Sequence, residues 1–222
     1  MRNFSFGKLA LPIYTILAFA FLLIPIFYTI LFSFNDAPAP NTTWKGFTLD
    51  HWTGVCSNET LCTALTNSIL IGVVSTIIAT ILGTAMAIAL VRYSFKGRGA
   101  APLSLFLPMA TPEVVLGAGL AAFFFNIGFP SGMLTIIIAH VVFCLSFVVV
   151  TVKARVQTLD PVLEEAGRDL YANPRQVFWK ITFPLLLPGI MAAALLSFAL
   201  SFDDFIITYF NSGAVDTFPK YI

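Results

Sequence analysis

Charged residues are scarce in this sequence of 222 residues. Only 10% of the residues are Asp, Glu, Lys or Arg, whereas roughly a quarter are charged in an ordinary soluble domain. The hydrophobic share is 58%, and a soluble chain of this size buries only about 70% of its surface. These proportions exclude a water-soluble globular domain and make lipid the expected solvent. The net charge of +1 gives no basic field of the kind that nucleic-acid-binding proteins carry.

Patterns for catalysis and metal binding are also lacking. The sequence has no G-x4-G-K-[ST] phosphate-binding loop, so any ATP chemistry must come from a separate subunit. Its 2 His and 3 Cys form no cluster with metal-ligand spacing, and no metal site is predicted. We expect His140 and Cys144 to be packed within a membrane helix. Cys56 and Cys62 lie in a predicted external loop, where an oxidising compartment would permit a disulfide, although their spacing is not specific for one.

Five intervals with few or no charges are long enough to cross a bilayer, which takes about 20 mainly apolar residues. They predict an all-α polytopic membrane bundle in a single domain. The expected spans are about 9–34, 65–91, 101–125, 133–151 and 184–210. A signal peptide is the alternative for the first interval, but its apolar core would be only about 7–15 residues long. Small residues at four-residue spacing predict close helix packing in the second interval, at Ala79, Gly83 and Ala87.

The distribution of Lys and Arg predicts the orientation of these spans. With a cytoplasmic N-terminus, all of the 12 Lys and Arg residues except Lys45 and Lys220 lie inside, as the positive-inside rule requires. The short basic segment from Arg92 to Arg98 is then a cytoplasmic hairpin. Five spans place the C-terminus outside, so the expected helix count is odd.

The cytoplasmic segment 152–182 is longer than a simple connector. Asp160-Pro161 and Asn173-Pro174 each combine an N-cap side chain with a proline at the first helical position. Gln176 follows Asn173 by three residues, where a capping-box partner stands. The segment therefore predicts two short helices joined by a turn. From these residues alone, a surface hairpin that only caps the bundle is an equal alternative.

This segment resembles the EAA loop of bacterial ABC-importer permeases, written E-A-A-x3-G-x9-I-x-L-P. The match runs from Glu165-Ala166-Gly167 to Ile181-Thr182-Phe183-Pro184. Gly167 replaces the second Ala of the pattern, Tyr171 its Gly and Phe183 its Leu. The resemblance implies that the loop docks on an ATPase subunit and transmits its motion. The implied coupling residues are Glu164, Glu165, Ala166, Gly167, Asp169, Tyr171 and Ile181.

Further segments, beginning at Trp44, Thr111, His140 and Ser201, are similar to the PotC-type permeases of spermidine/putrescine importers. This resemblance covers essentially the whole chain and implies a type I ABC-importer permease in the bacterial inner membrane. It implies a second homologous permease subunit, two ATPase subunits that hold ATP and Mg, and a periplasmic substrate-binding protein. It also implies a sixth membrane helix after the segment that ends at Ile222, which agrees with the odd helix count.

Three carboxylates lie inside the predicted spans, namely Glu113, Asp203 and Asp204. An ionised carboxylate at the bilayer centre costs about 2.5–3.5 kcal/mol, and no intramembrane Lys or Arg is present to pair with these three. The compensating charge would come from a substrate or from a partner subunit, and we expect the three carboxylates to line a path for a cation such as a polyamine. Successive helical residues differ by about 100°, so Asp203 and Asp204 cannot both face one axis. The alternative is that these carboxylates are neutral, or hydrogen-bonded for packing near the outer interface.

The residues and the resemblance together give a set of candidate pathway residues. The set is Trp44, Glu113, Ser201, Asp203, Asp204 and Tyr209. Trp44 would offer an aromatic face to a cation, although an interfacial anchor is its commoner role, and Tyr209 has the same two interpretations. The chain itself would perform no covalent chemistry. Two alternatives remain, an importer of another small cationic or organic solute and an ATP-independent secondary transporter or channel, and the EAA-like loop argues against the second.

Overall fold

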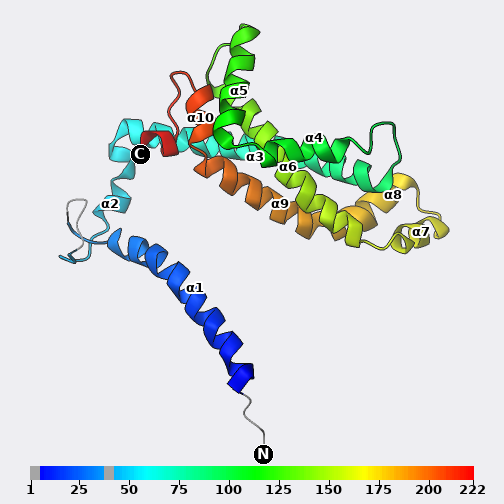
Figure 1. The fold of residues 1–222 in the computed structure, drawn as a ribbon, viewed down its shortest axis with the longest axis horizontal. Coiled ribbons are helices and arrows are strands. Elements are labelled where there is room, and N and C mark those ends of the chain that lie inside the picture. The colour runs from blue at the N-terminus through cyan, green and yellow to red at the C-terminus, as the bar shows by residue number, and fades with distance from the viewer. Residues whose placement is uncertain (1–5, 38–42) are drawn as a thin grey trace, which may run out of the picture. The chain divides into compact units, whose positions relative to one another are not determined.

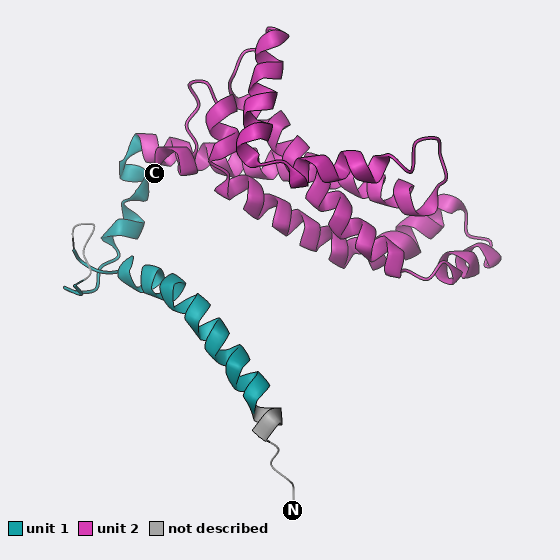
Figure 2. Cartoon of the chain, in the orientation of Figure 1, with its two compact units in different colours: residues 1–59 teal, residues 60–222 magenta. Residues whose placement is uncertain are grey.

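The computed structural model describes residues 6–37 and 43–222 (Figure 1). The chain divides into two units, residues 1–59 and 60–222, which are coloured separately in Figure 2. In the described ranges the secondary structure is helical, and the only extended pairing is an isolated bridge between Asn35 and Phe47. The all-α fold expected from the sequence is confirmed.

The first unit contains one long apolar helix, α1 (Phe6–Phe32). None of the residues in its most apolar part, within Ala10–Phe32, is buried by the rest of the chain. Apolar side chains cover every side of the helix. Thr15 and Thr29 donate their hydroxyls to backbone carbonyls four residues earlier, so these polar groups are satisfied inside the helix. A helix of this kind is suited to lipid, where each polar group needs a partner of its own.

After α1, the described loop residues 33–37 and 43–49 lead to the short helix α2 (Asp50–Thr53) and the 3-10 turn η1 (Val55–Ser57). The buried Asn35 side chain holds this loop, because its amide donates to the Thr43 carbonyl and its oxygen accepts from the Lys45 backbone. The Phe34 ring stacks on two further aromatic rings of the loop. The loop is therefore organised by side-chain bonds to the backbone and by aromatic contacts.

The second unit is built around three long helices, α3 (Glu59–Arg92), α6 (Met133–Thr158) and α9 (Phe183–Asp203). Ala79, Gly83 and Ala87 of α3 are all buried. A Cβ atom on Gly83 would lie 2.6 Å from Cγ1 of Val148, so α3 approaches α6 at a distance that only glycine allows. Within the described residues, four helical stretches are long and apolar enough to span a membrane, and the number is five if a bent pair of helices forms one span.

That bent pair occupies the interval 101–125, for which one span is predicted, without a break. The interval forms α4 (Ala101–Ala110) and α5 (Glu113–Asn126), which meet at an angle of 108°. Pro112 explains the bend, because proline lacks an N–H and disfavours helical geometry in the residue before it. Thr111 accordingly has an extended backbone, with ψ of 131°. The bend places Glu113 at the start of a helix instead of in the middle of one.

The last expected span, 184–210, is also broken. Helix α9 ends at Asp203, and α10 (Ile206–Asn211) begins after a non-helical step at Asp204. Beyond it, α11 (Phe218–Tyr221) is tied to α3 because the Phe218 backbone N–H donates to the Ser68 hydroxyl over 2.8 Å. The chain thus changes direction within the apolar part of the sequence.

The segment before α9 contains the two short helices that its caps predict, α7 (Val162–Asp169) and α8 (Pro174–Val177). The capping box is confirmed, since Asn173 and Gln176 each accept from the other's backbone N–H over 2.9 Å. Helix α8 continues through a π-helical turn, η2 (Phe178–Thr182), directly into α9. One continuous path of helical backbone therefore joins this segment to α9.

Candidate functional site

A cavity of about 450 Å³ lies where α5 begins and where α9 ends. It is lined by Glu113, Phe143, Leu196, Ala199, Leu200, Asp203, Asp204, Phe205 and Ile206. All of the charged residues in this lining are acidic, and the other walls are aliphatic or aromatic. An apolar cavity with a few carboxylates is suited to a ligand that carries both positive charge and hydrocarbon.

The two helix breaks put the exposed carboxylates into this cavity. Glu113 is the first residue of α5 and follows the bend at Pro112, and Asp203 is the last residue of α9. The final carbonyl groups of a helix have no partners within the helix and carry partial negative charge. The end of α9 therefore adds to the negative potential of Asp203. A cation in the cavity would be favoured by both.

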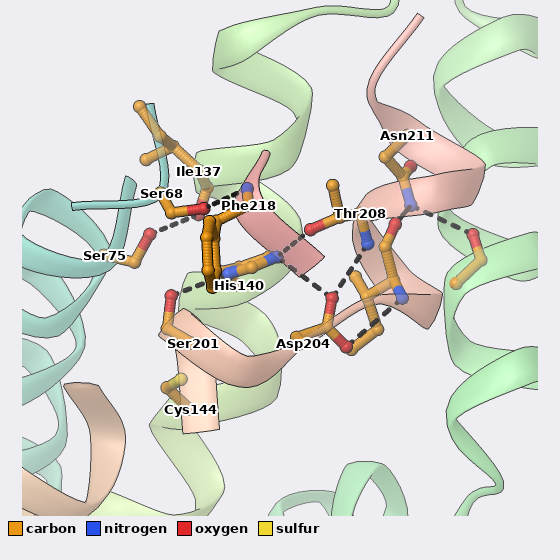
Figure 3. Close-up of polar contacts among 12 residues, drawn as sticks. Ser68, Ser75, Ile137, His140, Cys144, Ser201, Asp204, Thr208, Asn211 and Phe218 are labelled. Carbon is orange, nitrogen blue, oxygen red and sulfur yellow. Dashed lines mark hydrogen bonds and ion pairs between the residues drawn. The ribbon is translucent and has the colours of Figure 1, made fainter. Parts of the chain in front are cut away.

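Asp204 has different surroundings from Asp203, although the two are adjacent. Asp204 is only 8% exposed, and its carboxylate accepts from the backbone N–H groups of Ile207 and Thr208 at 3.3 and 2.9 Å. The same carboxylate lies 3.3 Å from Nε2 of His140 on α6 (Figure 3). Asp204 thus caps the start of α10 and links it to α6.

His140 connects three helices at this point (Figure 3). Its Nδ1 lies 2.7 Å from the Ser201 hydroxyl on α9, and its Nε2 lies 2.9 Å from the Thr208 hydroxyl on α10. All of these side chains are buried. The prediction that His140 is packed and hydrogen-bonded is confirmed. Buried polar groups that satisfy each other fix one arrangement of the helices around them.

Asn211 extends the network to α5. Its side-chain amide donates to the carbonyl groups of Gly117 and Ile207 at 3.2 and 2.8 Å. Its backbone carbonyl accepts from the Thr135 hydroxyl at 2.7 Å. Gly117 allows this contact, because a Cβ atom there would lie 3.2 Å from the Ile207 Cα. Helices α5, α6, α9 and α10 are therefore joined by polar bonds directly behind the acidic cavity.

The predicted pathway residues fall into separate places. The cavity brings together Glu113, Asp203 and Asp204. Ser201 does not line the cavity and is bonded to His140. Tyr209 is 59% exposed on α10 and its ring packs on Phe205.

Trp44 lies in the first unit, 45% exposed, with its ring edge-on to Phe32.

Sequence reasoning missed Thr208 and Asn211 as parts of the site. The signal for them was weak, because single polar residues in an apolar helix do not reveal their partners.

The candidate coupling residues divide into an inward and an outward group. Glu164 faces inward, where its carboxylate lies 3.2 Å from the Arg92 guanidinium of α3 and accepts from the Thr182 hydroxyl at 3.2 Å. Glu165, Ala166 and Asp169 are exposed on α7. The outward group is therefore the one available to another protein.

Local packing explains one departure from the EAA pattern, the glycine at position 167. A Cβ atom on Gly167 would lie 2.5 Å from Cδ1 of Ile181, so the side chain of Ile181 occupies the space that an alanine methyl group would need. Tyr171 has a positive φ of 58°, and it is 98% exposed at the tip of the turn. The Tyr171 and Ala172 backbone N–H groups donate to the carbonyls of Arg168 and Gly167. The turn is thus the Schellman turn that glycine usually makes, here formed by tyrosine.

The cysteines also differ from one another. Cys56 and Cys62 are disulfide-bonded. Cys144 is free and buried on α6, and its thiol lies 3.5 Å from the Ser197 carbonyl.

Comparison with known proteins gives consistent similarities. Residues 79–215 match the family model described as binding-protein-dependent transport system inner membrane component. The chain is 37% identical over 195 residues to the spermidine/putrescine transport system permease protein PotC of Haemophilus influenzae. The aligned region covers 88% of this chain and 76% of that protein. The chain is also 36% identical over 205 residues to the putrescine transport system permease protein PotI of Escherichia coli, with coverages of 89% and 73%.

Solved structures show the same fold at low sequence identity. A bacterial ABC transporter involved in the import of the acidic polysaccharide alginate aligns with a TM-score of 0.73 and 18% identity, over 99% of this chain and 80% of that chain. An amino acid ABC transporter aligns with a TM-score of 0.60 and 17% identity, over 79% and 81% of the two chains.

Proposed function

This chain belongs to the family of binding-protein-dependent transport system inner membrane components, and from this we infer that it is the permease subunit of an ATP-driven importer of polyamines. It is a multi-pass inner-membrane protein and is not itself catalytic. The substrate class follows from relatives whose names specify spermidine and putrescine. We propose that the N-terminus is cytoplasmic, as the positions of Lys and Arg predict.

The acidic cavity is the observation that supports a polyamine as substrate. A linear polyamine has ammonium groups separated by short methylene chains. Glu113 and Asp203 would pair with ammonium groups, and apolar walls such as Phe143 and Leu200 would contact the methylene groups. A phenyl ring also attracts a cation to its face. The cavity therefore offers both kinds of contact that the substrate requires.

The segment from α7 to α8 is the proposed docking surface for an ATPase subunit. Its exposed face carries Glu165 and Asp169, and Tyr171 forms the tip of the turn. ATP and Mg would be held by two such ATPase subunits, since this chain lacks a phosphate-binding loop. A second permease subunit would complete the membrane part, and a periplasmic binding protein would deliver the substrate. The helical path through η2 would carry motion from the docking surface to α9.

Uptake by the reconstituted importer tests the role of the cavity. We expect Asp203→Asn and Glu113→Gln each to lower spermidine uptake about tenfold, with normal assembly and thermal stability. An ammonium–carboxylate pair at about 4 Å is worth about 4 kcal/mol at an effective dielectric constant of 20, and a net loss of about 1.4 kcal/mol after desolvation gives a tenfold effect. Asp36→Asn is the matched control, because Asp36 is exposed and lies outside the cavity.

Two results would contradict the proposal. One is unchanged uptake in both cavity variants. The other is stimulation of ATP hydrolysis only by a solute without positive charge, which would keep the importer assignment but replace the polyamine with another substrate.

A further inference from the structure

A second, smaller cavity lies at the C-terminal end of α3. It has a volume of about 170 Å³ and is lined by Leu90, Val91, Arg98, Pro102, Lys153 and Gln157. These residues come from the end of α3, the turn between α3 and α4, the start of α4 and the last turns of α6. In the proposed orientation this is the level of the cytoplasmic headgroups. A liquid water molecule takes up about 30 Å³, so the cavity has room for a group larger than one or two waters.

The charged residues in this lining, Arg98 and Lys153, are both cations. In the described part of the chain, no carboxylate forms an ion pair with either of them. Nearby cations are bonded differently, since Arg92 pairs with Glu164 and the Arg155 side chain donates to the Leu185 carbonyl. Two unpaired cations on one small cavity repel each other, and an anion between them would remove that repulsion.

The backbone directs Arg98 toward this place. Gly97 has φ of +90°, which other residues rarely adopt, and this turn lets the chain reverse after α3. Arg98 then donates through Nε to the Leu90 carbonyl at 3.0 Å. This bond holds the guanidinium at the end of α3 and leaves its terminal N–H groups available. The guanidinium is therefore presented in the forked geometry that suits a phosphate group.

The surroundings favour a lipid over a soluble anion. Helix α4, whose first turn lines the cavity, exposes the large apolar side chains Leu103, Phe106 and Leu107. Acyl chains would cover such side chains, while the headgroup reaches the cations. We propose that this cavity binds the phosphate group of an anionic phospholipid of the cytoplasmic leaflet. Basic pockets between membrane helices on the cytoplasmic side are known to bind anionic headgroups.

Lipid binding to the full-length protein tests the proposal. The protein is purified in neutral detergent, and retained phosphatidylglycerol or phosphatidylcholine is measured by native mass spectrometry and by the shift in unfolding temperature. We expect each protein molecule to retain one phosphatidylglycerol molecule in preference to phosphatidylcholine. Arg98→Gln and Lys153→Gln should each weaken its binding about fivefold, as expected for the loss of one cation near an anionic headgroup.

Lys96→Gln is the matched control, because Lys96 lies in the same basic hairpin but does not line the cavity. Arg98→Lys keeps the charge but loses the forked geometry and the Nε bond, so it should retain more binding than Arg98→Gln and less than the unchanged protein. Equal retention of both lipids, or an equal effect of Lys96→Gln and Arg98→Gln, would overturn the proposal. A shift produced by millimolar inorganic phosphate as large as that produced by the lipid would assign the site to a soluble phosphate instead.

Discussion

The ion pair between Arg92 and Glu164 is predicted to fasten the α7–α8 segment to α3. The two side chains are 19% and 18% exposed, and the atoms that meet are 3.2 Å apart. Removal of one partner from a fully buried pair costs about 3–5 kcal/mol, whereas an exposed pair is worth about 0.2–1 kcal/mol. For a pair buried to this degree, we expect Arg92→Gln to cost about 2 kcal/mol. The Thr182 hydroxyl bond to Glu164 adds to the penalty of misplacing that carboxylate.

The first assay is thermal unfolding of the single variants Arg92→Gln and Glu164→Gln and of the double variant. For a chain of this length about 2 kcal/mol corresponds to a fall of about 4–8 °C in unfolding temperature. The effects of the single variants should not add in the double variant, because each removes the same interaction. Arg168→Gln is the control, since Arg168 lies on α7 beside the same pair without forming an ion pair in the described structure.

The second assay measures coupling. If the pair carries motion from the docking surface to α3, Arg92→Gln should lower substrate uptake per ATP hydrolysed, while ATP hydrolysis itself continues. Additive single effects, or an equal loss in Arg168→Gln, would refute the idea that this pair joins α7 to α3.

Two further predictions concern backbone geometry. Tyr171→Gly should raise stability by about 1 kcal/mol, because a left-handed conformation costs a non-glycine residue about 1–2 kcal/mol and glycine loses some chain entropy in return. A lower unfolding temperature would contradict this. Gly83→Ala should destabilise the protein by about 1–3 kcal/mol, since its new Cβ would lie 2.6 Å from Cγ1 of Val148. Gly119 lies inside α5 and has no atom near its Cβ, so Gly119→Ala should raise stability by about 0.4–1 kcal/mol in the same unfolding assay. Equal effects of the two alanine variants would rule out crowding.

The sequence predicted the helices well because uncharged intervals of membrane length have few alternative structures in lipid. The bend at Pro112 had a visible signal, since proline breaks the hydrogen-bond ladder. The break at Asp204 had none, because two carboxylates within an apolar interval do not show which of them leaves the helix. Asp204 is held inward by His140, which is far away in sequence, and by the backbone N–H groups of Ile207 and Thr208.

The site was predictable in composition but not in arrangement. The cost of charge in lipid distinguishes Glu113 and Asp203 in the sequence, and the structure places both on one cavity. The inward direction of Glu164 depends on Arg92, which is far away in sequence. The exchange of an alanine for Gly167 depends on the position of the Ile181 side chain. Such compensation between distant residues cannot be deduced from local patterns.

The number of residues in the π-helical turn Phe178–Thr182 determines how α9 is rotated about its axis relative to α8. A π-turn holds one residue more than an α-turn, and each added residue rotates everything that follows by about 100°. The number of residues in this turn, next to the proposed docking surface, therefore sets which face α9 presents to its neighbours. It also sets the direction of Asp203. Unwinding or removal of one residue in this turn would rotate a helix whose other end borders the acidic cavity. The turn thus acts as a fixed angular offset between α8 and α9.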